Sequence, residues 1–385
     1  MPDDWENGGF GLYIHWPFCQ AKCPYCDFNS HVSASIDQNR WADAYVAELE
    51  RYRGPAGDRI LGSVFFGGGT PSLMDPETVH RILDKVREIW RTTNNPEITL
   101  EANPTSVEAG HFVGYRDAGV NRVSMGIQAL NNHDLRKLGR LHSVEEALSA
   151  FDIARNAFDR VSFDLIYARQ DQTLEGWKNE LELALGLAVD HLSMYQLTIE
   201  DGTAFGDRYA AGKLRGLPDD DRAADMYDLT QEICDKFGFP AYEVSNHAKP
   251  DAESIHNKIY WQYGDYIGIG PGAHGRLTQN GHRFATEAHR NPNMWLNLVE
   301  THGSGQTNFD QLSPEDELTE FLLMGMRLSE GVDVDRLRNL GGDEVLSKAD
   351  DLLDQQLLTI ENNRLSVTPS GRPILNAVLR ALLAD

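Results

Sequence analysis

The sequence predicts an α/β fold in which a parallel sheet with helices on its outer side precedes a smaller α+β domain. Strand-like apolar runs alternate with helical patterns over the first 200 residues, as in sheets built from right-handed crossovers. After residue 310 the pattern changes to helices around one short hairpin. With 385 residues, the chain is long enough for each of these units to have its own core.

Six segments have the apolar, β-rich composition of buried strands. They are residues 11–16, 60–66, 97–102, 121–127, 160–167 and 191–199. Helical patterns, several beginning at a Ser, Thr or Asp in the capping position, fill the connections. They cover residues 40–52, 76–90, 106–119, 143–158 and 173–188. Such a series forms an open sheet or a barrel, and its ligand site lies at the carboxyl ends of the strands.

Residues that can carry chemistry follow five of these strands. A cysteine cluster follows the first and GGGTPS, residues 67–72, follows the second; Glu101, Gln128 and Asp164 lie at the ends of the next three. We expect one face of the sheet to bring them together. Three glycines in succession allow backbone amides to approach a ligand closely.

The first strand leads into YIHWPFCQAKCPYCDFNSH, which contains three of the four cysteines. Cys19, Cys23 and Cys26 have the spacing C-x3-C-x2-C, while Cys234 takes an apolar position of a predicted helix, as a small core residue does. Three thiolates on a [4Fe-4S] cluster leave one iron open, and an open metal position is typical of chemistry.

Three alternative roles for the clustered cysteines are less favourable. Three core cysteines would rarely lie so close together. A structural zinc site needs four ligands and would have to recruit His15 or His31. Covalent haem attachment is excluded because Asp27, not a histidine, follows Cys26.

This motif, with Tyr25 just before the last cysteine, resembles that of the radical S-adenosylmethionine (SAM) superfamily. The resemblance implies a partial (β/α)6 barrel and a [4Fe-4S] cluster on Cys19, Cys23 and Cys26. It also implies that SAM chelates the open iron and is therefore the missing fourth ligand. In that family the reduced cluster cleaves SAM to a 5'-deoxyadenosyl radical.

The order YIHWPFC, CPYCDF, FGGGTPS, LEANP, SMGIQ, LGRLHS and FDLIY is similar to one branch of the superfamily, which contains oxygen-independent coproporphyrinogen III dehydrogenase and the haem chaperones. The resemblance implies that SAM is contacted by Tyr13, Tyr25, Gly68, Gly69, Thr70, Glu101, Gln128, Arg140 and Asp164. Carboxylates can accept from ribose hydroxyls or the methionine amine, and Arg140 can pair with a carboxylate. The alternative for Arg140 is a solvated loop arginine.

Three features favour the chaperones over the dehydrogenase. Phe28 stands where the dehydrogenase has a further cysteine, and only 18 residues precede the first cysteine. HNKIYW, residues 256–261, matches the chaperone signature H-N-x-x-Y-W, formed here by His256, Asn257, Tyr260 and Trp261. The histidine could ligate haem iron and the two aromatic rings could lie against a porphyrin. The alternative is a core aromatic cluster with a hydrogen-bonded histidine.

We therefore expect a haem chaperone that passes haem to recipient haem proteins, with oxidative decarboxylation of coproporphyrinogen III as the alternative function. Whether the chain is an enzyme stays open. After FDLIY the usual G-L-P-G-Q-T is replaced by Ala168-Arg169-Gln170-Asp171-Gln172-Thr173, which alters the available turn geometry and adds charge beside Asp164. A homodimer is also left open.

Composition excludes several classes of protein. A formal net charge of -24 disfavours nucleic acid as a partner. The amino terminus lacks a signal peptide, and no apolar run is long enough for a membrane helix, so we expect a cytoplasmic protein. Gly270, Gly272 and Gly275 match G-x-G-x-x-G, but the apolar helix of a dinucleotide site does not follow them.

Three domains are expected. Residues 1–200 form the barrel core with the cluster, residues 201–305 extend the barrel and contain H-N-x-x-Y-W, and residues 306–385 form a winged-helix-like domain. Residues 311–385 contain 7 Lys+Arg against 14 Asp+Glu, so this domain is expected to dock or cover rather than bind DNA.

Overall fold

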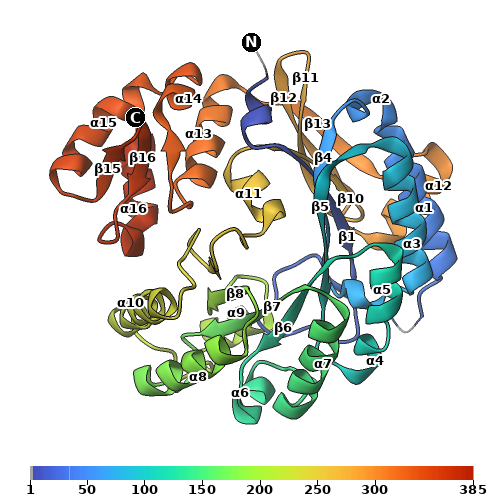
Figure 1. Ribbon diagram of the computed structural model, residues 1–385, viewed down its shortest axis with the longest axis horizontal. Coiled ribbons are helices and arrows are strands. Elements are labelled where there is room, and N and C mark those ends of the chain that lie inside the picture. The colour runs from blue at the N-terminus through green and yellow to red at the C-terminus, as the bar shows by residue number, and fades with distance from the viewer. Residues whose placement is uncertain (1–2, 34, 385) are drawn as a thin grey trace.

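The computed structural model describes residues 3–33 and 35–384. It has a curved sheet with helices on its outer side and a separate C-terminal domain facing the inner side of that sheet (Figure 1). The predicted α/β class, with a partial barrel of parallel strands, is confirmed.

Six neighbouring strands run parallel and form the partial barrel. They are β1 (Phe10–Trp16), β4 (Ile60–Gly68), β5 (Arg91–Ala102), β6 (Arg122–Gln128), β7 (Arg160–Tyr167) and β8 (His191–Gln196). Because both faces of these strands are covered, β1 and β7 are buried almost throughout, which explains their continuous apolar runs. The first half of β5 is polar and exposed, so the sequence pattern detected only its second half.

Helices form the connections between these strands. They are α1 (Gln38–Arg51), α2 (Arg53–Ala56), α3 (Pro76–Ile89), α4 (Ser106–Ala109), α5 (Phe112–Ala118), α6 (Asn132–Lys137), α7 (Val144–Ala157) and α8 (Leu174–Leu187). Short 3-10 turns are η1 (Asp4–Asn7), η2 (Pro71–Leu73) and η3 (Arg372–Ile374). Asp37, Ser143 and Thr173 accept the first-turn hydrogen bonds of α1, α7 and α8, as the capping positions predict.

Further strands widen the sheet at both edges. They are β9 (Asn246–Ala248), antiparallel to β8, then β10 (Asp265–Ile269), parallel to β1, and β11 (His274–Gln279), β12 (His282–Ala288) and β13 (Gln306–Gln311), which are antiparallel. This part also contains α9 (Ala204–Ala210), α10 (Asp220–Lys236), α11 (Ile255–Trp261) and α12 (Pro292–His302).

The C-terminal domain has a core of its own. Its elements are α13 (Pro314–Gly325), β14 (Val332–Asp333), α14 (Val334–Asn339), α15 (Asp343–Asp354), β15 (Leu358–Glu361), β16 (Arg364–Val367) and α16 (Leu375–Leu383). The predicted order of helices around one hairpin is confirmed, with β14 as a third strand beside β16.

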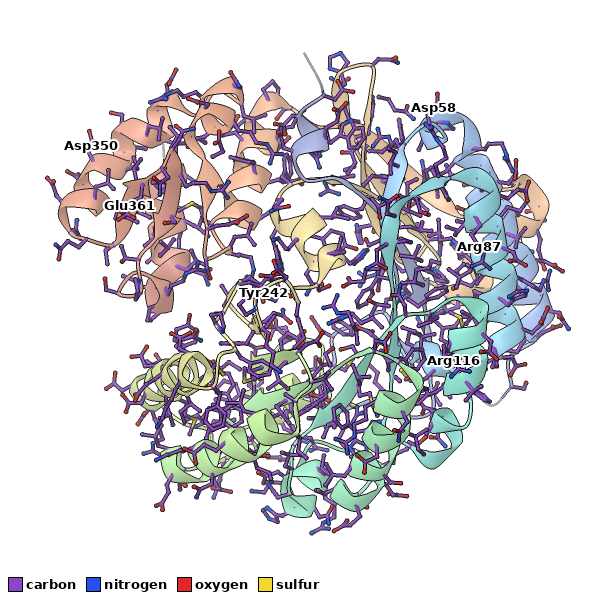
Figure 2. All side chains as sticks on the ribbon, in the orientation of Figure 1. Asp58, Arg87, Arg116, Tyr242, Asp350 and Glu361 are labelled. Atoms are coloured by element: carbon purple, nitrogen blue, oxygen red, sulfur yellow. The ribbon has the colours of Figure 1, made fainter. Side chains whose placement is uncertain are left out.

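Residues before and after position 200 share one hydrophobic core, which joins Leu12 and Trp177 to Ile267 and Trp295. The predicted division at residues 200 and 305 stays a prediction. Figure 2 shows the labelled charged side chains at the rim of the molecule, whereas Tyr242 lies between the barrel and the C-terminal domain. None of the described helices is both long and apolar enough to cross a membrane.

Candidate functional site

The cysteine loop connects β1 to two very short parallel strands, β2 (Phe18–Cys19) and β3 (His31–Val32). These strands pair Phe18 with His31 and thereby bring the two ends of the loop together. Inside the loop, the Cys26 N–H donates to the Cys23 carbonyl at 3.1 Å and forms a tight turn. The segment is therefore a closed loop at the carboxyl end of β1.

Each of the three sulfurs has a polar neighbour. The Thr70 hydroxyl donates to Cys19 Sγ at 3.4 Å, and Arg140 Nη1 donates to Cys23 Sγ at 3.3 Å. The Ser30 hydroxyl lies 4.0 Å from Cys26 Sγ. Donors directed at sulfur favour thiolates, which are the form that binds iron, whereas burial raises the pKa of Cys19 and Cys26.

The zinc alternative would require a histidine beside the loop as a fourth ligand. Both ring nitrogens of His15 already have partners, Tyr13 OH at 3.0 Å and the Asn29 carbonyl at 2.9 Å.

The glycines after β4 are needed for close packing. A Cβ at Gly68, whose φ is +109°, would lie 2.6 Å from the His15 ring, and one at Gly69 would lie 2.7 Å from the Phe18 carbonyl oxygen. The amides are used inside the protein: those of Gly69 and Thr70 donate to the carbonyls of Trp16 and Phe18 at 2.7 and 2.8 Å. The amides of Gly69 and Thr70 thus hold the segment against the cysteine loop, and the predicted contact of Gly68, Gly69 and Thr70 with SAM stays a prediction.

The same loop is supported from its other side by the glycine motif after β10. A Cβ at Gly270 would lie 2.3 Å from the His15 carbonyl oxygen, and one at Gly272 would lie 2.6 Å from Asn29 Nδ2. Asn29 donates to the Pro271 carbonyl at 2.8 Å. No helix follows, because β11 turns back antiparallel to β10, in agreement with the exclusion of a dinucleotide site.

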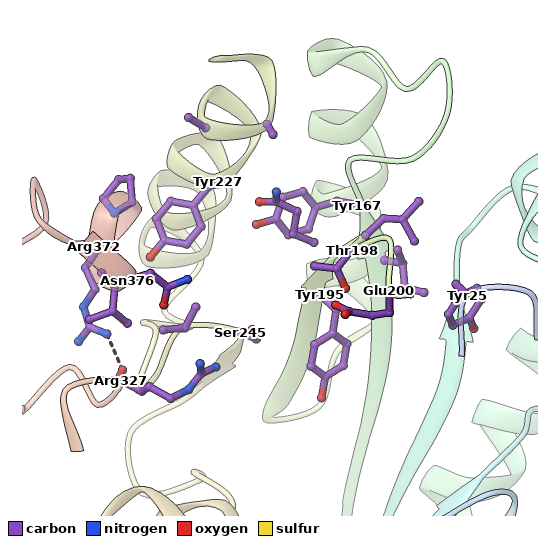
Figure 3. Close-up of a pocket in the computed structure, with 18 of the residues that line it drawn as sticks. Tyr25, Tyr167, Tyr195, Thr198, Glu200, Tyr227, Ser245, Arg327, Arg372 and Asn376 are labelled. Carbon is purple, nitrogen blue, oxygen red and sulfur yellow. Dashed lines mark hydrogen bonds between the residues drawn. The ribbon is translucent and has the colours of Figure 1, made fainter. Parts of the chain in front are cut away.

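A cavity of about 860 Å³ lies beside the cysteine loop, between the strand ends and the C-terminal domain (Figure 3). Four of the predicted SAM residues line it together with Cys26: Tyr25, Glu101, Gln128 and Asp164. This volume lies in the range of small-molecule sites, roughly 300 to 1,000 Å³. The expectation that strand ends meet on one face is thus met for the third, fourth and fifth strands.

Gln128 is the member of this set that most directly indicates a ligand. It is a non-glycine residue with a φ of +73°, which turns the chain at the end of β6. Its Oε1 is buried and has no hydrogen-bond partner among residues 3–33 and 35–384. A buried amide oxygen without a partner is unfavourable, so a donor group on a bound molecule would stabilise this side chain.

A second chamber of about 190 Å³ adjoins the large cavity, and Glu101, Asp164 and Tyr195 line both. Burial raises the pKa of Glu101 to about 8, and the Asp164 carboxylate adds to this rise. Burial also raises the pKa of Asp164 to about 6, although Ser193 and Ser124 donate to it. A cationic group bound beside these two carboxyl groups would stabilise their ionised forms.

The remaining predicted SAM residues lie around these two spaces. Tyr13 lines the smaller chamber, whereas the glycines and Thr70 support the cysteine loop. Arg140 is not a solvated loop arginine, since it contacts Cys23 and donates to Asn103 Oδ1 at 2.6 Å and to the Gly126 carbonyl at 2.8 Å. Its Nε is buried and has no partner within the described part of the chain.

HNKIYW forms the short helix α11, which is held on the sheet by Glu97 of β5. This carboxylate accepts from the Ser254 hydroxyl and the His256 amide, each at 3.1 Å. His256 Nδ1 lies 2.8 Å from the Ser63 hydroxyl, and its Nε2 lies 2.8 Å from the Tyr260 hydroxyl. Burial lowers the pKa of His256 to about 3. Both ring nitrogens are engaged, so this geometry favours a hydrogen-bonded core histidine over an iron ligand.

The other residues of the motif face two directions. Asn257 Nδ2 donates to the Tyr242 hydroxyl at 3.2 Å, and Asn257 lines the smaller chamber together with His256 and Tyr260. Trp261 instead faces the C-terminal domain, where the guanidinium of Arg327 lies 4.6 Å from its ring centroid. The motif therefore connects the chamber to the C-terminal domain.

The segment after β7 keeps a turn that suits glycine although its glycines are replaced. Ala168 and Asp171 both adopt left-handed backbone conformations, with φ of +57° and +60°. Arg169 is buried and ion-paired with Glu180 and with Asp134, whose Oδ2 lies 3.0 Å away. The departure from the family sequence thus changes the side chains of the turn but keeps its backbone conformation. The charge of Arg169 is neutralised by ion pairs inside the protein.

Sequence reasoning missed several cavity residues. Tyr195 at the end of β8, Tyr227 on α10, and Arg327, Arg372 and Arg380 of the C-terminal domain line the large cavity. No motif marks the three arginines, which come together only when the C-terminal domain packs beside the barrel.

Comparisons with known proteins agree with this geometry. The family model for the radical SAM superfamily matches residues 13–184, and that for the HemN C-terminal domain matches residues 312–374. The heme chaperone HemW of Escherichia coli K12 is 36% identical over 380 residues, which cover 97% of this chain and 98% of that protein. HemW of Mycobacterium tuberculosis H37Rv is 35% identical, with 97% and 95% covered.

Two further comparisons extend the range of relatives. The mouse mitochondrial protein named radical S-adenosyl methionine domain-containing protein 1 is 38% identical over 97% of this chain and 87% of its own length. Among solved structures, coproporphyrinogen III oxidase (HemN) from Escherichia coli superposes with a TM-score of 0.82 at 21% identity, covering 98% of this chain and 90% of that one. The latter similarity bears on the fold alone.

Proposed function

We propose a function from the premise that this chain belongs to the radical SAM superfamily, within the family of the heme chaperones named HemW. The chain binds haem on a scaffold that carries a [4Fe-4S] cluster and SAM, and it passes the haem to recipient haem proteins. The observation that carries this proposal is the similarity to HemW proteins over nearly the whole of both chains.

The cysteine loop supports the cofactor part of the proposal. Cys19, Cys23 and Cys26 would hold the cluster, with the Thr70 hydroxyl and the Arg140 guanidinium stabilising negative charge on two of the sulfurs. When bound, cluster and SAM together supply the one-electron reductive cleavage of a C–S bond. On the protein side, Glu101 and Asp164 offer carboxylates to SAM hydroxyl and amine groups, and Gln128 offers its unpartnered amide oxygen.

Phe28 supports the chaperone over the decarboxylase. Its side chain is 58% exposed and lines the large cavity, at the position where the dehydrogenase motif has a further cysteine. An apolar ring there offers surface to a flat apolar cargo and provides no ligand or redox group. The predicted cytoplasmic location and the exclusion of nucleic acid are kept as parts of this proposal.

The proposal is tested by an anaerobic titration of the cluster-reconstituted protein with haem, followed by the Soret band. Saturable binding with one haem per chain is expected. In parallel, coproporphyrinogen III is incubated with the reduced protein and SAM, and no conversion is expected. Conversion of that substrate without saturable haem binding would reject the chaperone function in favour of the decarboxylase.

A further inference from the structure

The large cavity has one wall with acidic side chains and one with arginines. Before residue 310, its lining residues include five acidic side chains and no Lys, Arg or His; the acidic ones are Asp27, Glu101, Asp164, Glu200 and Asp220. From the C-terminal domain, its lining residues include three arginines and no acid. That domain has twice as many acidic as basic residues overall, 14 against 7, so a purely basic wall is unexpected from its composition.

Two of these arginines have no charged partner. Arg372 donates to the main-chain carbonyls of Arg327 and Leu328, and Arg380 donates to the Asn376 carbonyl at 3.2 Å. Neither makes an ion pair with a described residue of the chain. Burial lowers the pKa of Arg372, whereas Tyr227 and the Glu243 carboxylate act in the opposite direction and Arg327 lowers it further. Guanidinium groups that form no ion pair beside a cavity attract an anion, and a carboxylate matches their geometry.

The third arginine reaches into the cavity from the same side (Figure 3). Arg327 forms an ion pair with Glu243, whose Oε2 lies 3.3 Å from its Nη2, and its guanidinium lies over the ring of Trp261. Its Nε is buried and lacks a partner among the described atoms. Trp261 is therefore a positioning residue for this wall, which gives the HNKIYW motif a connection to the cavity without direct contact by its histidine.

Apolar and aromatic groups lie beside the arginines. Ile374 and Leu375 follow Arg372 in the chain, and Val244, Tyr195 and Tyr227 also line this part of the cavity. Figure 3 shows Tyr227 next to Asn376 and Arg372, with Tyr195 across the cavity. A molecule that suits this half of the cavity has a large apolar body and carboxylates at one edge.

From these contacts we infer that the C-terminal domain binds the haem by its two propionate carboxylates, through Arg372 and Arg380, while the porphyrin ring lies against Tyr195, Tyr227 and Leu375. This inference rests on the proposed haem-carrying function and specifies its binding site. The acidic wall on the barrel side is left to SAM, so the two ligands occupy opposite sides of one cavity.

The test compares haem with iron protoporphyrin IX dimethyl ester, in which both propionates are uncharged. Wild-type protein, Arg380→Gln and Arg338→Gln are titrated with both compounds by the Soret band. Arg380 is exposed, so we expect its replacement to leave the fold intact; Arg338 is an exposed control in the same domain, paired with Asp335. Arg380→Gln should weaken haem binding roughly fivefold to tenfold. A tenfold change in affinity corresponds to about 1.4 kcal/mol.

The effects of the Arg380→Gln substitution and of esterifying the propionates should not be additive. Wild-type protein should bind the ester more weakly than haem, and Arg380→Gln should have little further effect on the ester, because the charge pair is already lost. Equal losses with haem and ester, or no loss with haem, would overturn the inference while leaving the haem-carrying function standing. No saturable binding of haem by wild-type protein would refute the proposed function and this inference with it.

Discussion

The buried carboxyl group of Glu101 makes stability depend on pH. Its pKa is raised from 4.5 to about 8, mainly by burial, so the folded protein holds a proton that the unfolded chain releases above pH 4.5. Because the native state binds more protons between these values, the free energy of unfolding falls as pH rises through that range. The contribution is fully present at low pH and is lost by about pH 8.

The size of this effect follows from the shift. Between pH 5.5 and 8, Glu101 lowers the free energy of unfolding by about 3 kcal/mol, at about 1.4 kcal/mol for each pH unit. Glu101→Gln cannot ionise, yet its amide oxygen can still accept from the Gly68 N–H, which lies 3.3 Å from Oε2 in the wild type. The variant should therefore keep its stability over this pH range better than the wild type.

The assay is urea unfolding of the cluster-free protein at pH 5.5 and pH 8.5, for wild type, Glu101→Gln and the exposed control Glu175→Gln. Between these two pH values, we expect the free energy of unfolding of the wild type and the control to fall by about 3 kcal/mol more than that of Glu101→Gln. Parallel losses in all three proteins would show that Glu101 ionises normally in the native state and would refute the reasoning.

Three further predictions concern the site. Ala168→Val should lower the free energy of unfolding by about 2 kcal/mol, because a β-branched residue resists a φ of +57°. Ala168→Gly should change the free energy of unfolding by less than about 1 kcal/mol. Unchanged thermal unfolding of Ala168→Val would contradict the left-handed conformation of this residue. His256→Ala should destabilise by about 2 to 3 kcal/mol, since it leaves the hydroxyls of Ser63 and Tyr260 unpaired; weaker haem binding at unchanged stability would instead indicate direct contact. SAM binding at pH 7 should release roughly one proton from Glu101, measured by calorimetry in buffers of different ionisation enthalpy, and a buffer-independent heat would argue against an amine at this carboxylate.

Much of the barrel was predictable from sequence because its strands are buried on both faces. β1, β4, β6 and β7 lie within a residue or two of the predicted limits, since their apolar runs are continuous. The start of β5 at Arg91 escaped because its residues are polar and exposed. The contacts of Tyr242 with His191 and Asn257 join segments far apart in the sequence, and no local pattern predicts them.

The site was predictable where a local motif carried it. The cysteine spacing and the polar strand ends pointed to Cys26, Glu101, Gln128 and Asp164, which line one cavity. The close packing of Gly68 and Gly69 on His15 and Phe18 was not predictable, because these residues are far from them in sequence. The burial of His256 and the arginine wall depend on contacts between distant segments, and no local pattern encodes them.

Haem delivery tests the chaperone function most directly. Haem-loaded protein is mixed with increasing concentrations of apomyoglobin, a passive scavenger, and separately with the apo form of a haem protein from the same organism. We predict a transfer rate that rises with the concentration of the recipient and exceeds the scavenging rate, because haem passes within a complex of the two proteins. A single rate that is the same for both acceptors and independent of their concentration would mean simple dissociation and would contradict a chaperone function.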